Sequence, residues 1–190
     1  LRGHELCIVD ARGRPLPERQ VGMLEFRGPS ATAGYYRNPE ASAALFHDGW
    51  LSTGDHAYLA EGELYITGRA KEMIIRAGRN LYPYDLEQAV GDLAGVRKGC
   101  VAVFGAHAPG QTDERLIVVA ETRVRDTEAR AALEAGISAA AMGQLGLAPD
   151  VVVLAPPHAV LKTSSGKLAR AATRDAYLAG TLGAPSRAAW

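Results

Sequence analysis

The stretch LKTSSGKLAR, residues 161 to 170, places Lys167 behind a glycine and three small hydroxyl residues. Three interpretations are possible: a phosphate-binding loop, a solvent-exposed linker, or a mobile arm that carries a cation into an active site. A phosphate-binding loop needs a glycine separated by four residues from the Gly-Lys pair, and Ser or Thr after the lysine. Leu161 and Leu168 occupy those two positions, so the first interpretation fails and the other two stay open.

Two further residues could bind a nucleotide. In GWLSTGD, Asp55 is expected at the end of a glycine-punctuated loop, where its carboxylate could accept hydrogen bonds from the two vicinal hydroxyls of a ribose. The alternative is a carboxylate that caps a turn after Gly54. In TGRAKEMI, Arg69 is expected at a strand end, where its fork of donors could hold a ribose or phosphate oxygen. The alternative is a surface ion pair.

The elements that must position these residues differ along the chain. Residues 1 to 70 alternate short apolar runs with turns, and predict a β-rich region with one short helix capped by Asn38 and Pro39. After Arg69, strands alternate with helices. Strands are expected within 72–78, 99–105, 115–123 and 150–157, and helices within 83–95, 126–146 and 168–180. The alternation after Arg69 predicts a compact α/β or α+β domain, of which we expect α+β, with a domain boundary near residues 69 to 72.

Composition narrows the classes of protein. The 190 residues include 21 basic and 21 acidic side chains, and this zero net charge argues against generic nucleic-acid binding. Two distant cysteines, Cys7 and Cys100, have no disulfide or metal-ligand spacing, and no metal site is predicted. Apolar runs fall short of the roughly 20 residues that span a bilayer. We expect a cytoplasmic protein.

Together, in this order, the motifs resemble those of the adenylate-forming enzymes: acyl-CoA synthetases, peptide-synthetase adenylation domains, luciferases and fatty acyl-AMP ligases. GWLSTGD is similar to the family's aspartate motif, GELYITGRAKEMI to its hinge motif and LKTSSGKLAR to its C-terminal lysine motif. The resemblance implies that Asp55 and Arg69 bind the ribose of ATP, that Lys71 is the hinge and that Lys167 is the catalytic lysine. Many relatives have aspartate at the hinge position.

The resemblance also implies an architecture. Residues 1–70 would be the terminal, β-barrel-like part of a large adenylation domain, and residues 71–190 a mobile C-terminal lid. ATP and Mg²⁺ would be bound mainly by an N-terminal domain upstream, so the isolated chain should be inactive.

Within the family, GRNLYPYDLEQAV followed by VRKGCVAVFG looks most similar to fatty acyl-AMP ligases. The resemblance implies an acid-thiol ligase that activates a carboxylic, fatty acid as acyl-AMP. The acyl group would then pass to the phosphopantetheine thiol of an acyl carrier protein, along a path lined by Gly78. The alternatives are an acyl-CoA synthetase that transfers to CoA and a non-catalytic module that docks a carrier protein.

Overall fold

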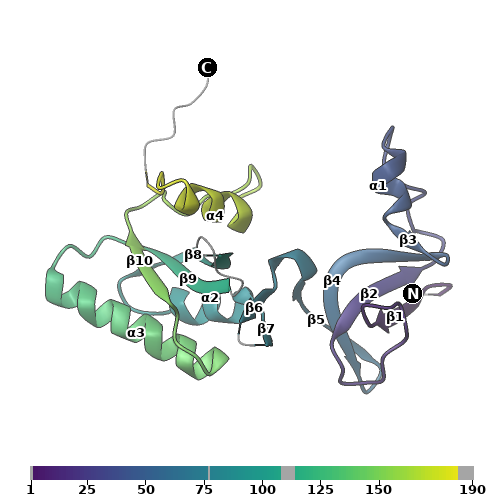
Figure 1. Cartoon of the computed structure of the whole chain (residues 1–190), viewed down its shortest axis with the longest axis horizontal. Coiled ribbons are helices and arrows are strands. Elements are labelled where there is room, and N and C mark those ends of the chain that lie inside the picture. The colour runs from purple at the N-terminus through teal and green to yellow at the C-terminus, as the bar shows by residue number, and fades with distance from the viewer. Residues whose placement is uncertain (1, 77, 108–113, 184–190) are drawn as a thin grey trace. The chain divides into compact units, whose positions relative to one another are not determined.

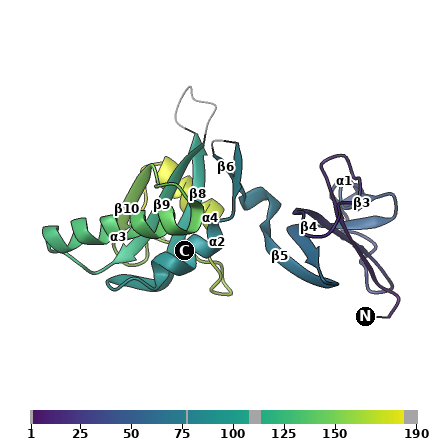
Figure 2. The ribbon, with the colours of Figure 1, turned by 90° about the horizontal axis from the view of Figure 1, so that it is seen from below.

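The structure is a computed structural model that describes residues 2–76, 78–107 and 114–183. The chain forms two compact units, Leu1–Lys71 and Glu72–Trp190, and each is described separately. Figures 1 and 2 show a first unit of strands with one short helix and a second unit of helices against a sheet. The division between the units lies one residue after the boundary expected between residues 70 and 71.

The first unit is built on an antiparallel sheet with the order β1-β2-β4-β3, in which β5 also pairs with β4. Its strands are β1 (Glu5–Val9), β2 (Gly22–Arg27), β3 (Phe46–His47), β4 (Trp50–Ala60) and β5 (Glu63–Arg69). Ile8, Leu24 and Ala57 form its small core. Glu61 and Gly62 join β4 to β5 with positive φ at both residues, as a tight two-residue hairpin turn requires.

Helix α1 (Pro39–Ala43) begins as the sequence predicts. The Asn38 side chain accepts a hydrogen bond of 3.0 Å from the backbone N–H of Ala41, and Pro39 occupies the first turn, where a missing N–H costs nothing.

The second unit contains a three-stranded sheet with the order β10-β9-β8, in which β10 is parallel and β8 antiparallel to β9. Its elements are the 3-10 turn Ala70–Glu72 shared with the first unit, β6 (Ile74–Arg76), β7 (Arg79–Leu81), α2 (Pro83–Gly91), β8 (Val96–His107), β9 (Glu114–Thr122), α3 (Thr127–Leu145), β10 (Val151–Ala155) and α4 (Arg170–Leu178). The predicted α+β fold is therefore confirmed. Strand β7 was not predicted.

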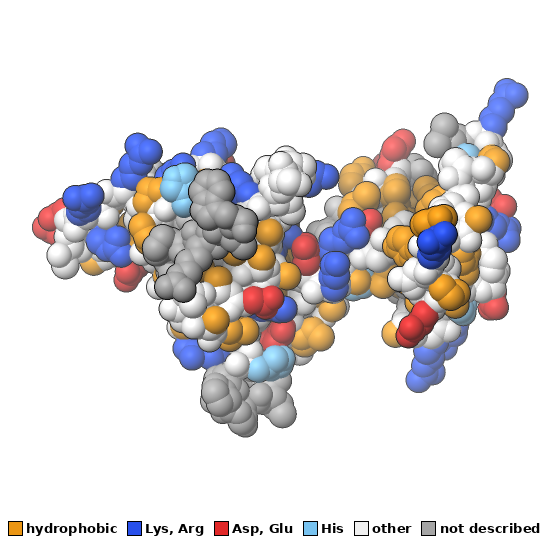
Figure 3. All heavy atoms as spheres, turned by 90° about the horizontal axis from the view of Figure 1, so that it is seen from above, with side chains coloured by type: hydrophobic (Ala, Val, Ile, Leu, Met, Phe, Trp, Pro, Cys, Tyr) orange, Lys and Arg blue, Asp and Glu red, His pale blue; other side chains and the backbone are white. Residues whose placement is uncertain are grey.

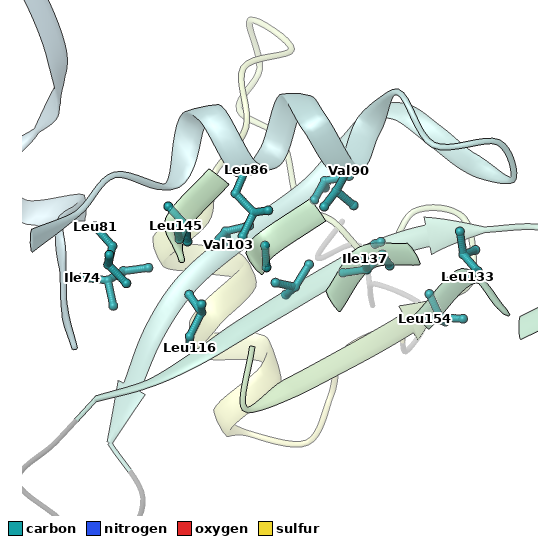
Figure 4. Close-up of a cluster of buried hydrophobic side chains, with 14 residues drawn as sticks. Ile74, Leu81, Leu86, Val90, Val103, Leu116, Leu133, Ile137, Leu145 and Leu154 are labelled. Atoms are coloured by element: carbon teal, nitrogen blue, oxygen red, sulfur yellow. The ribbon is translucent and has the colours of Figure 1, made fainter. Parts of the chain in front are cut away.

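Both faces of this sheet are buried, so its strands read as continuous apolar runs. On one face, α2 and α3 pack through residues such as Leu86 and Ile137 against Val103 and Leu116, as Figure 4 shows. On the other face, Phe104 and its neighbours contact Leu168 and Tyr177, so the lysine stretch and α4 cover that side. The sheet thus fixes the segment that carries Lys167.

The β6–β7 hairpin, which contains Gly78, is fastened to the sheet by polar contacts. Arg76 pairs with Asp150 at 2.6 Å, and the N–H of Ile75 donates to the Glu114 carboxylate at 2.7 Å. This carboxylate lies over Gly105 of β8, where a Cβ atom would stand 2.7 Å from it. Glycine at this position therefore makes room for the contact.

The surface carries both signs of charge. In Figure 3, Lys and Arg side chains are interspersed with Asp and Glu side chains on the visible face of each unit, in keeping with equal numbers of each. Within the described residues, no helix is long and apolar enough to cross a membrane.

Candidate functional site

Asp55 and Arg69 lie directly opposite each other on the adjacent antiparallel strands β4 and β5. Arg69 Nε and Asp55 Oδ1 form an ion pair at 2.9 Å, with the Asp55 side chain 24% exposed and that of Arg69 55% exposed. The structure thus brings these two predicted site residues together. Because an ionised carboxylate has about four lone-pair sites, one bond to Arg69 leaves Asp55 able to accept further hydrogen bonds.

Asp55 lies within strand β4, whereas the sequence indicated the end of a loop. The pairing of β2 with β4 is irregular around Gly54, which has a φ of +73°. This bulge, centred on a residue that tolerates positive φ, explains the loop-like sequence inside a strand. Bulges commonly redirect a side chain next to a functional site.

Thr53, for which the sequence analysis predicts no role, holds this bulge in place. Its hydroxyl accepts a hydrogen bond from the N–H of Asp55 at 3.0 Å and donates to the carbonyl of Leu24 at 3.0 Å. A hydroxyl residue two positions before an aspartate, with glycine between, is a local side-chain-to-backbone turn pattern that could have revealed it.

His56 follows Asp55 in the strand. Burial lowers the pKa of the His56 imidazole below its ordinary value, so the ring is neutral near pH 7. It therefore adds no positive charge beside the Asp55 carboxylate.

A groove of about 300 Å³ runs along this part of the first unit. Its walls include Tyr35, Leu45, Thr53, Gly54 and Arg69. The arginine that pairs with Asp55 thus also lines an open groove with polar and apolar walls, the mixed lining typical of small-molecule sites.

Lys167 lies on a hairpin whose backbone hydrogen bonds span the Ser-Gly stretch. Lys162 and Leu168 form an antiparallel bridge. The N–H of Thr163 donates to the Lys167 carbonyl at 2.8 Å, and the N–H of Gly166 donates to the Thr163 carbonyl at 2.9 Å. With Gly166 at φ +80°, this matches a three-residue hairpin loop closed by a glycine in the left-handed region.

The Lys167 side chain is exposed at the end of this loop. In the part of the chain that the structure describes, its ammonium group forms no ion pair, whereas its backbone N–H donates to Thr163 Oγ1 at 3.1 Å. The backbone of this residue is therefore held while its charge stays available to another group. Such an arrangement suits a cation that must meet a negatively charged ligand.

Lys71 and Gly78 occupy two different turns. Lys71 is exposed in the 3-10 turn Ala70–Glu72, which links the two units. Gly78 lies between β6 and β7 with a φ of +70°, and an added Cβ would meet no atom within 4 Å. Its backbone conformation, rather than crowding within this chain, is what favours glycine here.

Lys167 and Gly78 belong to the second unit, and Asp55 and Arg69 to the first. Among the described residues, no group of three or more His, Cys, Asp or Glu side chains could hold a metal ion. The two cysteines are free, with Cys100 buried and Cys7 half-buried.

Among known proteins, no protein-family model matches the chain. The chain is 40% identical over 185 residues to a Caulobacter vibrioides protein that carries an acyl-CoA synthetase name, covering 96% of this chain and 32% of that protein. It is 34% identical to the long-chain-fatty-acid–AMP ligase FadD32 of Mycolicibacterium smegmatis, covering 92% of this chain and 34% of the relative.

Solved structures show a similarity to the same kinds of enzyme. The structure of McyG A-PCP complexed with phenylalanyl-adenylate superimposes with a TM-score of 0.81 at 34% identity, covering 94% of this chain and 28% of that one. A structure from work on fatty acyl-adenylate ligases of E. coli and L. pneumophila gives a TM-score of 0.78 at 34% identity, covering 94% and 31%.

The chain thus spans about a third of the length of these curated relatives. Three observations indicate the same family: the order of the three motifs, the α+β fold and these similarities. The chain belongs to the adenylate-forming superfamily of acyl-CoA synthetases, fatty acyl-AMP ligases and peptide-synthetase adenylation domains.

Proposed function

We propose that this chain is the C-terminal part of an ATP-dependent acid-thiol ligase. The ligase activates a carboxylic acid as acyl-AMP and then passes the acyl group to a phosphopantetheine thiol. Residues 1–70 are proposed as the end of the large adenylation domain and residues 71–190 as its mobile lid. The observation that carries the proposal is an exposed Lys167 on a hydrogen-bonded hairpin, without an ion pair among the described residues, in a chain that also holds the Asp55–Arg69 pair.

Asp55 and Arg69 are proposed to bind the ribose of ATP. The Asp55 carboxylate accepts hydrogen bonds from the two vicinal hydroxyls, which are neutral donors that suit an acceptor with spare lone pairs. Arg69 orients that carboxylate through the ion pair with Oδ1, and the other donors of its guanidinium suit an oxygen of the nucleotide.

Lys167 is proposed as the catalytic residue of adenylation. An oxygen of the substrate carboxylate attacks the α-phosphorus of ATP, and the bond to the bridging oxygen breaks to release pyrophosphate. Negative charge concentrates around this phosphorus, and the Lys167 ammonium stabilises it electrostatically. Lys167 and Asp55 lie in different units, and the lid is proposed to turn about the segment containing Lys71 to deliver the lysine and then withdraw it. The proposal assigns no ligand of Mg²⁺ to this chain.

The acid is proposed to be fatty and the acceptor an acyl carrier protein in the cytoplasm. Relatives named for fatty acyl-AMP ligation support this choice, as does a related structure that includes a PCP. Transfer to CoA is the second candidate, because a relative at 40% identity carries an acyl-CoA synthetase name. Gly78 is proposed to line the pantetheine path.

The catalytic role is tested by Lys167→Ala in the full-length enzyme, with pyrophosphate exchange as the measurement. Loss of one preorganised donor to a developing charge typically lowers the rate about 10²–10³-fold, and we expect a loss of this size. Lys162→Ala is the matched control, because Lys162 is an exposed lysine on the same hairpin. Unchanged exchange in Lys167→Ala would favour a module that only docks a carrier protein.

The acceptor is tested by supplying preformed acyl-AMP to the full-length enzyme. Thioester formation is measured with free CoA and, separately, with a phosphopantetheinylated carrier protein. We expect transfer to the carrier protein, and efficient formation of the CoA thioester would support the second candidate.

A further inference from the structure

A partly buried charge cluster lies close to the lysine hairpin. Arg170, the first residue of α4, donates from Nε to Glu87 Oε1 at 2.6 Å and from Nη2 to Glu87 Oε2 at 2.7 Å. Its third nitrogen, Nη1, donates to Glu72 Oε2. The planar guanidinium thus uses its fork on one carboxylate and its remaining side on another, a geometry that lysine cannot reproduce.

The cluster also closes the open edge of the sheet. Strand β8 pairs only with β9 among the described strands, and the N–H of Val103 on β8 donates to Glu87 Oε1 at 3.0 Å. Glu87 belongs to α2 on one face of the sheet and Arg170 to α4 on the other. This set of contacts therefore joins both helical layers to the sheet edge.

The cluster is strongly held. The side chains of Arg170 and Glu87 are 16% and 8% exposed. Burial opposes the charge of Arg170, but the hydrogen bonds and charges of Glu87 and Glu72 outweigh it, so the pKa of Arg170 lies above its ordinary value. Removing one partner of such a buried set leaves an uncompensated charge and disrupts the local structure.

Arg170 is only three residues from Lys167, and α4 carries the base of the hairpin. The N–H of Leu161 donates to the Thr173 hydroxyl at 3.0 Å, and the N–H of Ala169 donates to the Leu161 carbonyl at 2.9 Å. Leu168 packs on the sheet next to them. The position of the Lys167 backbone therefore follows the position of α4.

At its other end, the cluster contains Glu72, the residue directly after the proposed hinge Lys71. The contact between Glu72 and Arg170 joins positions 98 residues apart in the sequence. It ties the first residue of the second unit to the beginning of the helix that supports the lysine hairpin.

We propose that Arg170 is a positioning residue for Lys167, which makes Glu72, α2 and the lysine hairpin one rigid body. This inference rests on the proposed role of Lys167 in adenylation. Rotation then occurs no later in the chain than Lys71, and each closure of the lid delivers the ammonium group to the same place. Small misplacements of a reacting group can cost up to about 10²-fold in rate, so a fixed linkage has a direct kinetic value.

The test is a double-mutant cycle in the full-length enzyme, using Arg170→Gln, Lys167→Ala and both together, with pyrophosphate exchange as the readout. We expect Arg170→Gln alone to lower kcat about tenfold, within the range of a misplaced catalytic group, with little change in the KM for ATP. In the Lys167→Ala background, we expect Arg170→Gln to cause no further loss. Equal losses in both backgrounds would show a general structural role and overturn the proposal.

Two more variants keep the test decisive. If Arg170→Gln does not fold in a thermal melt, Glu72→Gln replaces it in the cycle, because it leaves the Arg170–Glu87 fork intact; the same loss of effect in the Lys167→Ala background is expected. Arg174→Gln is the control, since Arg174 is on the same helix, more exposed and, among the described residues, paired only with its neighbour Asp175. It should change neither constant.

The outcomes also separate this inference from the proposed function. If Lys167→Ala leaves exchange unchanged, the proposed function fails. If Lys167→Ala lowers exchange and the Arg170 effect simply multiplies with it, only the positioning role fails.

Discussion

The two units hold their charged site residues in opposite ways. In the first, Asp55 sits in a strand and pairs with Arg69 directly across the sheet at 2.9 Å. In the second, Lys167 sits at the end of a hairpin whose backbone is hydrogen-bonded, and its ammonium group forms no ion pair in the described part of the chain.

The difference follows from what each group is proposed to meet. A carboxylate that accepts hydrogen bonds from neutral hydroxyls can keep a counter-ion, because the counter-ion occupies only part of its acceptor capacity and leaves lone pairs free. A cation that must stabilise charge developing on a phosphate is most effective when no permanent carboxylate neutralises it. The paired residue is thus suited to binding and the unpaired one to catalysis.

Among the substitutions that test this comparison, Asp55→Asn in the first unit is expected to have the largest effect. Hydrogen bonds to a charged group contribute about 1.5–3 kcal/mol, so we expect kcat/KM for ATP to fall about 10–100-fold in pyrophosphate exchange. Discrimination against 2′-deoxy-ATP and 3′-deoxy-ATP should disappear with it. Asp10→Asn is the control, since Asp10 also pairs with an arginine, Arg14, and is 23% exposed; retained discrimination in Asp55→Asn would contradict a ribose contact.

A smaller effect is expected from Lys71→Pro, which addresses the link between the units. Proline fixes φ and so restricts rotation at this residue. If the lid turns here, the rates of adenylation and of thioester formation should change by unequal factors in the full-length enzyme. Lys71→Ala removes the charge but not the rotation, and should leave the ratio of the two rates unchanged. Equal changes in Lys71→Pro would place the hinge elsewhere.

The smallest effects are expected from glycine substitutions in two hairpins of the second unit. Gly166 and Gly78 both have positive φ, and an added Cβ at either would meet no atom within 4 Å. Replacing each with alanine should therefore lower the free energy of unfolding by a similar amount, about 1–2 kcal/mol, measured by urea denaturation.

The same two variants should differ in function. Gly166→Ala is expected to slow adenylation, and Gly78→Ala to slow transfer to the thiol. Identical profiles for the two half-reactions would remove the distinction between the hairpins.

Local signals in the sequence predicted much of the fold. Asn38 before Pro39 starts the short helix where expected, and the helix expected within 126–146 forms at Thr127–Leu145. These signals work because caps depend on one or two residues and their own backbone.

What the sequence did not predict depends on partners distant in the chain. Strand β7 is only Arg-Asn-Leu and exists through its pairing with β6. Gly54 reads as part of a loop because its bulge is defined by the partner strand. The hairpin around Lys167 was not predicted, because it is held by backbone hydrogen bonds among small polar residues. The contact of Arg170 with Glu72 joins residues far apart in the sequence, so no local pattern indicates it.

The glycine at position 105 has a consequence for how related sequences can vary. Since the Glu114 carboxylate fills the space of its missing side chain and accepts the N–H of Ile75, a larger residue at 105 would push this carboxylate aside and disturb its contact with Ile75. Positions 105 and 114 should therefore covary among homologues, with a side chain at 105 tolerated only where the acid at 114 is also replaced.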